Sequence, residues 1–140
     1  MSDEGNIVSR RAPEPVGAFP HARRVGNLLF LSGIGPRVRG TKEIPGVTFD
    51  ARGNVAKYDI AAQTRQVFDN VRAVLEDSGS SWDRIVDVQV FLTDMRQDFE
   101  TFNGLYAEHF ADNQPTRTTV EVNRLPTPIA IELKVIATID

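Results

Sequence analysis

The sequence predicts an α+β fold in a single domain that spans residues 1–140. Two segments, residues 59–78 and 99–110, carry apolar side chains at the spacing of an amphipathic helix. The segments around them alternate apolar and polar residues with the period of two that a half-buried strand requires. The predicted order is a β-hairpin, a helix, a strand, a helix and a second β-hairpin.

The first helix has the clearest signal in the chain. Asp59 is a suitable N-cap, and Gly79 suits the turn that follows the last helical residue. The apolar stripe between them consists of Ile60, Thr64, Val67, Phe68, Val71, Val74 and Leu75. The second helix is shorter, and its stripe also indicates a face that packs on a sheet. This stripe consists of Phe99, Phe102, Tyr106 and Phe110.

Three strands are predicted before the second helix. Residues 25–32 form a strand that enters from a turn at Gly26 and Asn27, and residues 6–9 form a short edge strand. Residues 85–93 form the third strand. Its apolar face is predicted to hold Val86, Val88, Val90 and Leu92. The N-terminal segment is otherwise polar and contains several prolines, so we expect residues 1–15 to be flexible.

The C-terminal segment, residues 115–140, is predicted to be a hairpin whose strands are joined by a proline-rich turn at 124–128. In its second strand Ile131, Leu133, Val135 and Ala137 alternate with polar residues. If Thr118, Val120 and Val122 share the same core, the opposite face carries Arg117, Thr119, Glu121, Glu132 and Lys134. An arginine and a glutamate on neighbouring strands form either a structural ion pair or the two ends of a site, and both interpretations stay open.

Two helices cover only one face of such a sheet. The uncovered face mixes polar residues with Ile85, Phe91 and Ile136, which is too apolar for free exposure to water. We therefore expect the protein to be an oligomer that buries these faces between its copies.

Composition excludes several classes of function. The net charge of −3 and the pI near 5.4 give no general attraction to nucleic acid or to an anionic membrane surface. The chain has no cysteine and only two histidines, so we expect no thiolate chemistry and no metal centre. No apolar run approaches the ~20 residues of a membrane span, and no secretion signal is evident. We expect a soluble, cytoplasmic protein.

Residues 35–57 are predicted to form a long loop, with a small hairpin around residues 51–54. Loops of this length are uncommon in compact domains and are often functional. Arg37, Arg39 and Lys42 lie close together in it. The loop is either a solvated connection or a lid that binds an anion, and the sequence leaves both interpretations open.

A set of short motifs points to a known family. The C-terminal part contains the run Arg117-Thr118-Thr119-Val120-Glu121-Val122, then Leu125-Pro126, Ile131-Glu132 and Ile136-Ala137. Earlier in the chain stand Gly17-Ala18-Phe19, Leu31-Ser32-Gly33, Gln63-Thr64-Arg65 through Asp69-Asn70-Val71, and Asn103. In this order and spacing they resemble the YjgF/RidA family of small proteins. The resemblance implies a trimer with a bacillary chorismate mutase-like fold, in which two helices cover one face of a mixed six-stranded sheet.

The resemblance also implies roles for particular residues. It makes Arg117 the group that grips the substrate and Glu132 the group that handles water. Ser32, Gly33 and Asn103 correspond to further binding positions. Two positions depart from the family pattern: Phe19 stands where a tyrosine is common, and Thr119 stands where many members have a cysteine.

Within the family, the long basic loop and the motif Pro115-Thr116-Arg117-Thr118-Thr119 look like the 2-aminomuconate deaminase branch. That likeness implies hydrolytic release of ammonia from 2-aminomuconate, giving 4-oxalocrotonate, in bacterial breakdown of aromatic compounds. It implies no cofactor, and sites at the subunit interfaces of a trimer or of a hexamer made from two trimers. Arg37 and Arg39 are then candidates to bind the second carboxylate of this unsaturated amino-dicarboxylate. The alternatives are a generic 2-iminobutanoate/2-iminopropanoate deaminase and a ligand-binding trimer without catalysis.

Overall fold

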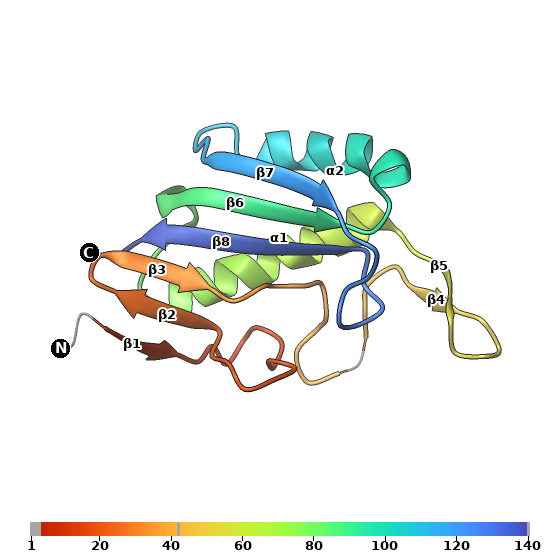
Figure 1. Ribbon diagram of the computed structural model, residues 1–140, viewed down its shortest axis with the longest axis horizontal. Coiled ribbons are helices and arrows are strands. Elements are labelled where there is room, and N and C mark those ends of the chain that lie inside the picture. Colours follow the sequence, from red (N-terminus) through yellow and green to blue (C-terminus); the bar gives the residue numbers. More distant parts are fainter. Residues whose placement is uncertain (1–3, 42, 140) are drawn as a thin grey trace.

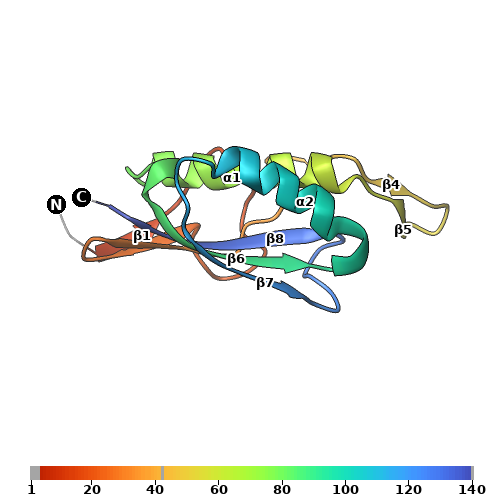
Figure 2. The same cartoon turned by 90° about the horizontal axis from the view of Figure 1, so that it is seen from above.

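The protein consists of one mixed six-stranded sheet with two helices on one of its faces (Figures 1 and 2). The structure, a computed structural model, describes residues 4–41 and 43–139. The elements in chain order are β1 (Glu4–Ile7), β2 (Ala22–Val25), β3 (Leu28–Leu31), β4 (Thr48–Phe49), β5 (Val55–Lys57), α1 (Ile60–Asp77), β6 (Ile85–Leu92), α2 (Met95–His109), β7 (Thr116–Glu121) and β8 (Ile131–Thr138), with a short 3₁₀ turn at Trp82–Arg84. The predicted α+β class is therefore confirmed.

The strand order is β1-β2-β3-β8-β6-β7, so the predicted C-terminal hairpin is wrong. β7 pairs with β6 in parallel, and β8 pairs antiparallel with β6 on its other side. The reason is the crossover through α2, which returns the chain to the end of the sheet where β6 began and so makes β7 parallel. The last strand then fills the place between β3 and β6 at the centre of the sheet.

The helices begin and end where local side chains satisfy the backbone. The Asp59 carboxylate accepts from the N–H groups of Ala61 and Ala62, and Gly79 follows the helix with φ 86°, which confirms both predicted ends of α1. α2 begins at Met95, four residues before the predicted start. The Asp94 side chain caps it by accepting from the N–H of Gln97.

A bulge changes the faces predicted for β6. Its pairing with β8 shifts register between Ile85 and Asp87. As a result Ile85 is 2% exposed and belongs to the core, whereas Val86 is 42% exposed and faces away from it. An extra residue in one strand reverses the alternation at that point, which an uninterrupted period of two does not predict. The predicted alternation holds for Val88, Val90 and Leu92, which are all buried.

The faces predicted for β7 are inverted. Arg117 pairs with Val88 and Thr119 with Val90, and directly paired residues project to the same face of a sheet. Arg117 and Thr119 therefore lie on the helix-covered face, while Val120 is 39% exposed on the other. β7 is an edge strand of the sheet and lies beside α2. Polar side chains on its helix-covered face can therefore reach solvent past the helix. In β8 the prediction is confirmed, since residues 131, 133, 135 and 137 are buried.

Within the described residues no helix covers the face of the sheet opposite α1 and α2, which we call the open face (Figure 2). Val25, Leu28, Val86 and Val120 are exposed hydrophobic residues on this face. This apolar surface is the feature from which the sequence predicts an oligomer.

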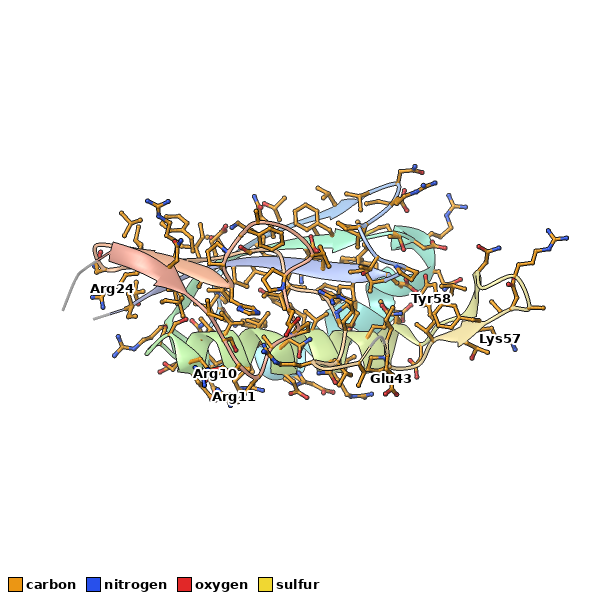
Figure 3. All side chains as sticks on the ribbon, turned by 90° about the horizontal axis from the view of Figure 1, so that it is seen from below. Arg10, Arg11, Arg24, Glu43, Lys57 and Tyr58 are labelled. Atoms are coloured by element: carbon orange, nitrogen blue, oxygen red, sulfur yellow. The ribbon has the colours of Figure 1, made fainter. Side chains whose placement is uncertain are left out.

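Two connections complete the fold. Residues 8–21, which we call the N-terminal strap, run between β1 and β2 and pack against α1, where Arg11 pairs with Asp77 at 2.7 Å (Figure 3). The small hairpin predicted near residues 51–54 is present as β4 and β5. In Figure 1 it projects beyond the N-terminal end of α1. The expected flexibility of residues 1–15 stays a prediction, and residues 1–3 lie outside the described part. Within that described part, neither helix has the length and apolar character needed to span a membrane.

Candidate functional site

A cavity of about 220 Å³ lies between the N-terminal strap, the chain that leaves β3, and the start of β8. The segment after β3 runs alongside β8, where Ile34 bridges Leu133. Five of the predicted site residues line this cavity: Phe19, Ser32, Gly33, Arg37 and Glu132. The fold thus brings together residues that lie far apart in the sequence.

Glu132 is the acidic group at the sheet side of the cavity. It lies on the open face of β8, paired with Phe91 on β6. Burial raises the pKa of its carboxyl above the ordinary value of 4.5. Among the described residues no cation forms an ion pair with it. A carboxylate that is desolvated and unpaired is well suited to exchange a proton with a bound molecule.

The Glu132 carboxylate occupies the space that a side chain at Gly33 would fill. A Cβ atom at position 33 would lie 2.7 Å from Oε2 and 2.9 Å from the carboxyl carbon, closer than nonbonded atoms approach. The glutamate side chain therefore packs directly on the backbone of residue 33. Only a residue without a side chain leaves this space to the carboxylate.

We expect Gly33→Ala to lower kcat about 100-fold for imine hydrolysis, the reaction that the family resemblance implies, without unfolding the protein. A misplacement of ~1 Å at a reacting group costs about this much in rate. The added methyl group meets the end of a flexible side chain, so Glu132 should move while the backbone stays. Steady-state kinetics with a thermal melt measures both effects. Gly40→Ala is the comparison for stability: its φ of 77° makes alanine strained there, although no atom lies within 4 Å of the added Cβ. Full activity in Gly33→Ala would show that the position of Glu132 is not critical.

Ser32 and His21 connect the cavity to the N-terminal strap. The Ser32 hydroxyl donates to the carbonyl of Pro20 at 2.7 Å. His21 is buried, accepts from the N–H of Ser9 at Nδ1 (2.9 Å), and lies 2.7 Å from the carbonyl of Pro13 at Nε2. The imidazole is therefore the neutral form with its proton on Nε2. Its role in holding the strap was not predicted, because side-chain bonds to distant backbone leave no sequence pattern.

The loop arginines have different positions. Arg37 lines the cavity and donates from Nη2 to the carbonyl of Glu14 at 2.8 Å. Arg39 donates from Nη1 to the carbonyls of Ser9 and Ala12 at 2.8 and 2.9 Å and is not among the residues that line the cavity. Lys42 lies outside the described residues.

Arg117 lies in a separate cluster under α2. Its Nη1 donates to the side-chain oxygen of Asn103 at 2.8 Å, and its guanidinium carbon is 4.6 Å from the centre of the Tyr106 ring. No carboxylate in residues 4–41 and 43–139 forms an ion pair with it, and Glu121 instead accepts from the N–H of Met95. The interpretation of Arg117 as half of a structural ion pair therefore has no support.

Buried hydroxyl groups lie near this guanidinium. Tyr106 Oη and Thr119 Oγ1 are buried and form no hydrogen bond within the described residues. Burial raises the pKa of Tyr106 to about 12, although the charge of Arg117 acts in the opposite direction. Thr119 lies two residues after Arg117 on the same face of β7. Both hydroxyls remain protonated donors at neutral pH.

Apart from Arg37 and Arg39, the predicted site residues form two groups in one chain. The glutamate half consists of Glu132, Gly33, Ser32 and Phe19. The arginine half consists of Arg117, Asn103 and Thr119. Glu132 projects from the open face and Arg117 from the helix-covered face, because their strand partners Phe91 and Val88 do so. The described residues contain no group of three or more metal-ligating side chains.

This fold and site define a small α+β protein with a desolvated carboxylate in a largely apolar cavity. A family model described as Endoribonuclease L-PSP matches residues 9–139. The chain belongs to this family, which is the YjgF/RidA family.

The chain covers its relatives almost completely. It is 40% identical over 132 residues to a RutC family protein of Pyrococcus horikoshii, with 94% of each chain covered. It is 35% identical over 134 residues to a protein of Escherichia coli K12 named 2-iminobutanoate/2-iminopropanoate deaminase, again with 94% of each covered. A crystal structure of E. coli TdcF with bound serine superposes with a TM-score of 0.82 at 32% identity, covering 97% of this chain and 99% of that one.

Proposed function

We propose that the protein is a hydrolase that deaminates small 2-imino acids and their enamine tautomers, releasing ammonia and leaving a 2-oxo acid. The observation that carries this proposal is the desolvated carboxylate of Glu132 against Gly33 in the cavity. The deaminase name of the E. coli relative and the serine bound to TdcF support a small amino-acid-like ligand. Deamination of such 2-imino acids is the alternative to 2-aminomuconate deamination that the family resemblance implied.

The reaction needs two functions from the protein: a group that binds the substrate carboxylate and a group that transfers protons. An enamine first tautomerises to an imine, whose carbon is open to attack by water. A guanidinium then holds the substrate carboxylate through two parallel hydrogen bonds, which is the role we assign to Arg117. Glu132 takes a proton from the attacking water as the C–O bond forms and passes it to the nitrogen, which gives a carbinolamine. The hydroxyl proton of this intermediate then moves to the nitrogen through Glu132, the C=O bond forms, the C–N bond breaks and ammonia leaves.

Two copies of the chain are needed to build this site. The glutamate half and the arginine half lie on opposite faces of one sheet, so a single substrate does not contact both within one chain. We propose that the arginine half of one copy faces the glutamate half of the next in a trimer. The exposed valines and leucine of the open face are the surface that such an assembly buries.

Activity should depend on pH through Glu132. Because the working form is the carboxylate, we expect kcat/KM to fall about tenfold per pH unit below the pKa of Glu132. Burial raises this pKa, so the loss should begin above the ordinary value of 4.5. A pH–rate profile from pH 4 to 8 on a stable imine analogue measures it. A flat profile down to pH 4.5 would contradict the role of Glu132.

Glu132→Gln is the control for this profile. The variant should lose most activity together with the acidic limb. A carboxyl group whose pKa is higher in the folded than in the unfolded protein lowers the free energy of unfolding when it is ionised. This cost disappears as the pH falls and the group becomes protonated in both states. The free energy of unfolding at neutral pH should therefore be no lower in Glu132→Gln than in the wild type.

The direct test generates 2-iminopropanoate from L-alanine with an amino-acid oxidase in the presence of semicarbazide, which traps the imine. An active protein should lower the initial rate of semicarbazone formation as its concentration rises, with pyruvate and ammonia as products, because pyruvate reacts with semicarbazide more slowly than the imine does. An unchanged initial rate with the oligomeric wild-type chain would refute the proposed function. Unchanged RNA in a parallel incubation is expected, because the net charge of −3 gives no general attraction to nucleic acid.

The narrower hypothesis of 2-aminomuconate as substrate has support from one observation. Arg37 contributes a cation to the cavity that contains Glu132, as a second carboxylate requires. Ammonia release from freshly prepared 2-aminomuconate tests it. A location in the cytoplasm stays a prediction.

A further inference from the structure

The cavity has more room and more apolar wall than the smallest imino acids use. Its volume of about 220 Å³ corresponds to the share of liquid volume of about seven water molecules. Val16, Phe19, Ile34 and Ile129 are among its lining residues, together with several prolines. A methyl or ethyl side chain beside Glu132 leaves much of this wall without contact. The cavity therefore suits a longer side chain.

Arg37 is the one lysine or arginine among the described residues that line this cavity. It forms no ion pair with a described carboxylate. One N–H at Nη2 bonds the carbonyl of Glu14, which leaves other donors of the guanidinium available. The Glu14 carboxylate is 77% exposed and lies 3.5 Å from Arg39. The Glu14 carboxylate therefore does not neutralise the charge of Arg37.

The backbone of this segment is held from α1. Asn70 is buried, and its Nδ2 donates to the carbonyls of Gly35 and Arg37, both at 2.9 Å. Gln66 donates in turn to the Asn70 side-chain oxygen. The backbone of Arg37 at the cavity is thus fixed by a buried amide on a helix, and its guanidinium is held by the carbonyl of Glu14. A group fixed before binding loses less conformational entropy when it meets a ligand.

We propose that Arg37 is a specificity-determining residue that makes the cavity prefer imines whose side chain ends in a second anionic group. This inference rests on the proposed function. The substrate's own carboxylate binds the arginine half of a second copy, and its reacting carbon lies beside Glu132. The side chain then extends along the apolar wall, and its anionic end meets the Arg37 guanidinium. Hydrogen bonds to a charged group of this kind change affinity about 10- to 100-fold.

The test compares three imines made by amino-acid oxidases from L-glutamate, L-leucine and L-alanine. They carry an acidic, an apolar and a small side chain. The readout is the ratio of kcat/KM for each of the first two imines to that for the alanine-derived imine. In the wild type we expect the glutamate-derived imine to be the best of the three. In Arg37→Gln its ratio should fall about tenfold or more, while the leucine ratio stays within about twofold.

Two further variants separate the charge of Arg37 from its contact with the strap. Arg37→Lys keeps the cation and should retain most of the preference. Arg39→Gln removes another arginine of the same loop, one that holds the strap but does not line the cavity. It should change all three rates together and leave the ratios unchanged. Thermal melts confirm that each variant is folded.

Unchanged ratios in Arg37→Gln overturn the proposal, as does a wild type that prefers the leucine-derived imine. A wild type that hydrolyses none of the three contradicts the proposed function instead. In that case calorimetry with 2-oxoglutarate and pyruvate decides the role of Arg37. Tighter binding of 2-oxoglutarate that is lost in Arg37→Gln supports the role, and equal binding of the two acids rejects it.

Discussion

Replacing Arg117 with alanine should lower kcat/KM for imine hydrolysis about a thousandfold. Truncating one partner of a close, desolvated charge pair costs ~4 kcal/mol, and each 1.36 kcal/mol is a factor of ten in rate. The guanidinium is already oriented by Asn103 and by its stacking on Tyr106, so its fork is in place before substrate binds. Steady-state rates at saturating and limiting imine concentrations measure the loss.

The oligomer should survive this substitution. Arg117 forms no ion pair within the described residues, and its contacts are with one amide and with the rings of α2. Light scattering after size exclusion should give the same mass as for the wild type. Arg117→Lys retains the charge without the fork and should recover only part of the rate. Arg96→Ala removes an exposed arginine from α2 and should have no effect. An active oligomer of Arg117→Ala would remove the basis of the proposed mechanism.

Local patterns predicted both helices and most of the strands. They missed β2, which ends before the turn at Gly26 and Asn27, and the other places where they failed have physical causes. The ends of α1 were predicted because Asp59 and Gly79 act within a few residues of the backbone that they cap. The β7–β8 hairpin was wrong because strand order depends on the crossover through α2, which adjacency in sequence does not show. Alternation in β7 has the correct period, but a period does not tell which face is covered.

The candidate site likewise depends on contacts between distant segments, which local sequence patterns do not predict. Neither spacing nor composition brings Glu132, Gly33 and Phe19 together, because they come from the start of β8, the end of β3 and the N-terminal strap, respectively. The family resemblance pointed to these positions. It placed Asn70 in a family motif without giving it a role, and it did not point to His21. The buried side chains of these two residues bond carbonyl and N–H groups of the segments that form the cavity wall. Bonds of this kind are visible only once the chain is folded.

Because the two halves of the site are separated within one chain, we expect two inactive variants to recover activity when they form a hybrid oligomer. Arg117→Ala and Glu132→Gln should each be nearly inactive, yet hybrids that contain both chains should recover activity. In every mixed trimer, one interface joins an intact arginine half to an intact glutamate half. A purified hybrid should therefore show about one third of the wild-type activity, compared with about a thousandth for either parent.

The hybrid is obtained by co-expression of the two variants with different affinity tags and capture on both tags in succession. The two parent proteins, purified separately and mixed just before the assay, are the matched control and should stay inactive until their subunits exchange. Recovery in the hybrid requires that Arg117 and Glu132 of one site come from different copies, because no chain in the mixture carries both. A hybrid as inactive as its parents would mean that each chain uses its own pair, which the opposite faces of the sheet do not allow without a change in fold.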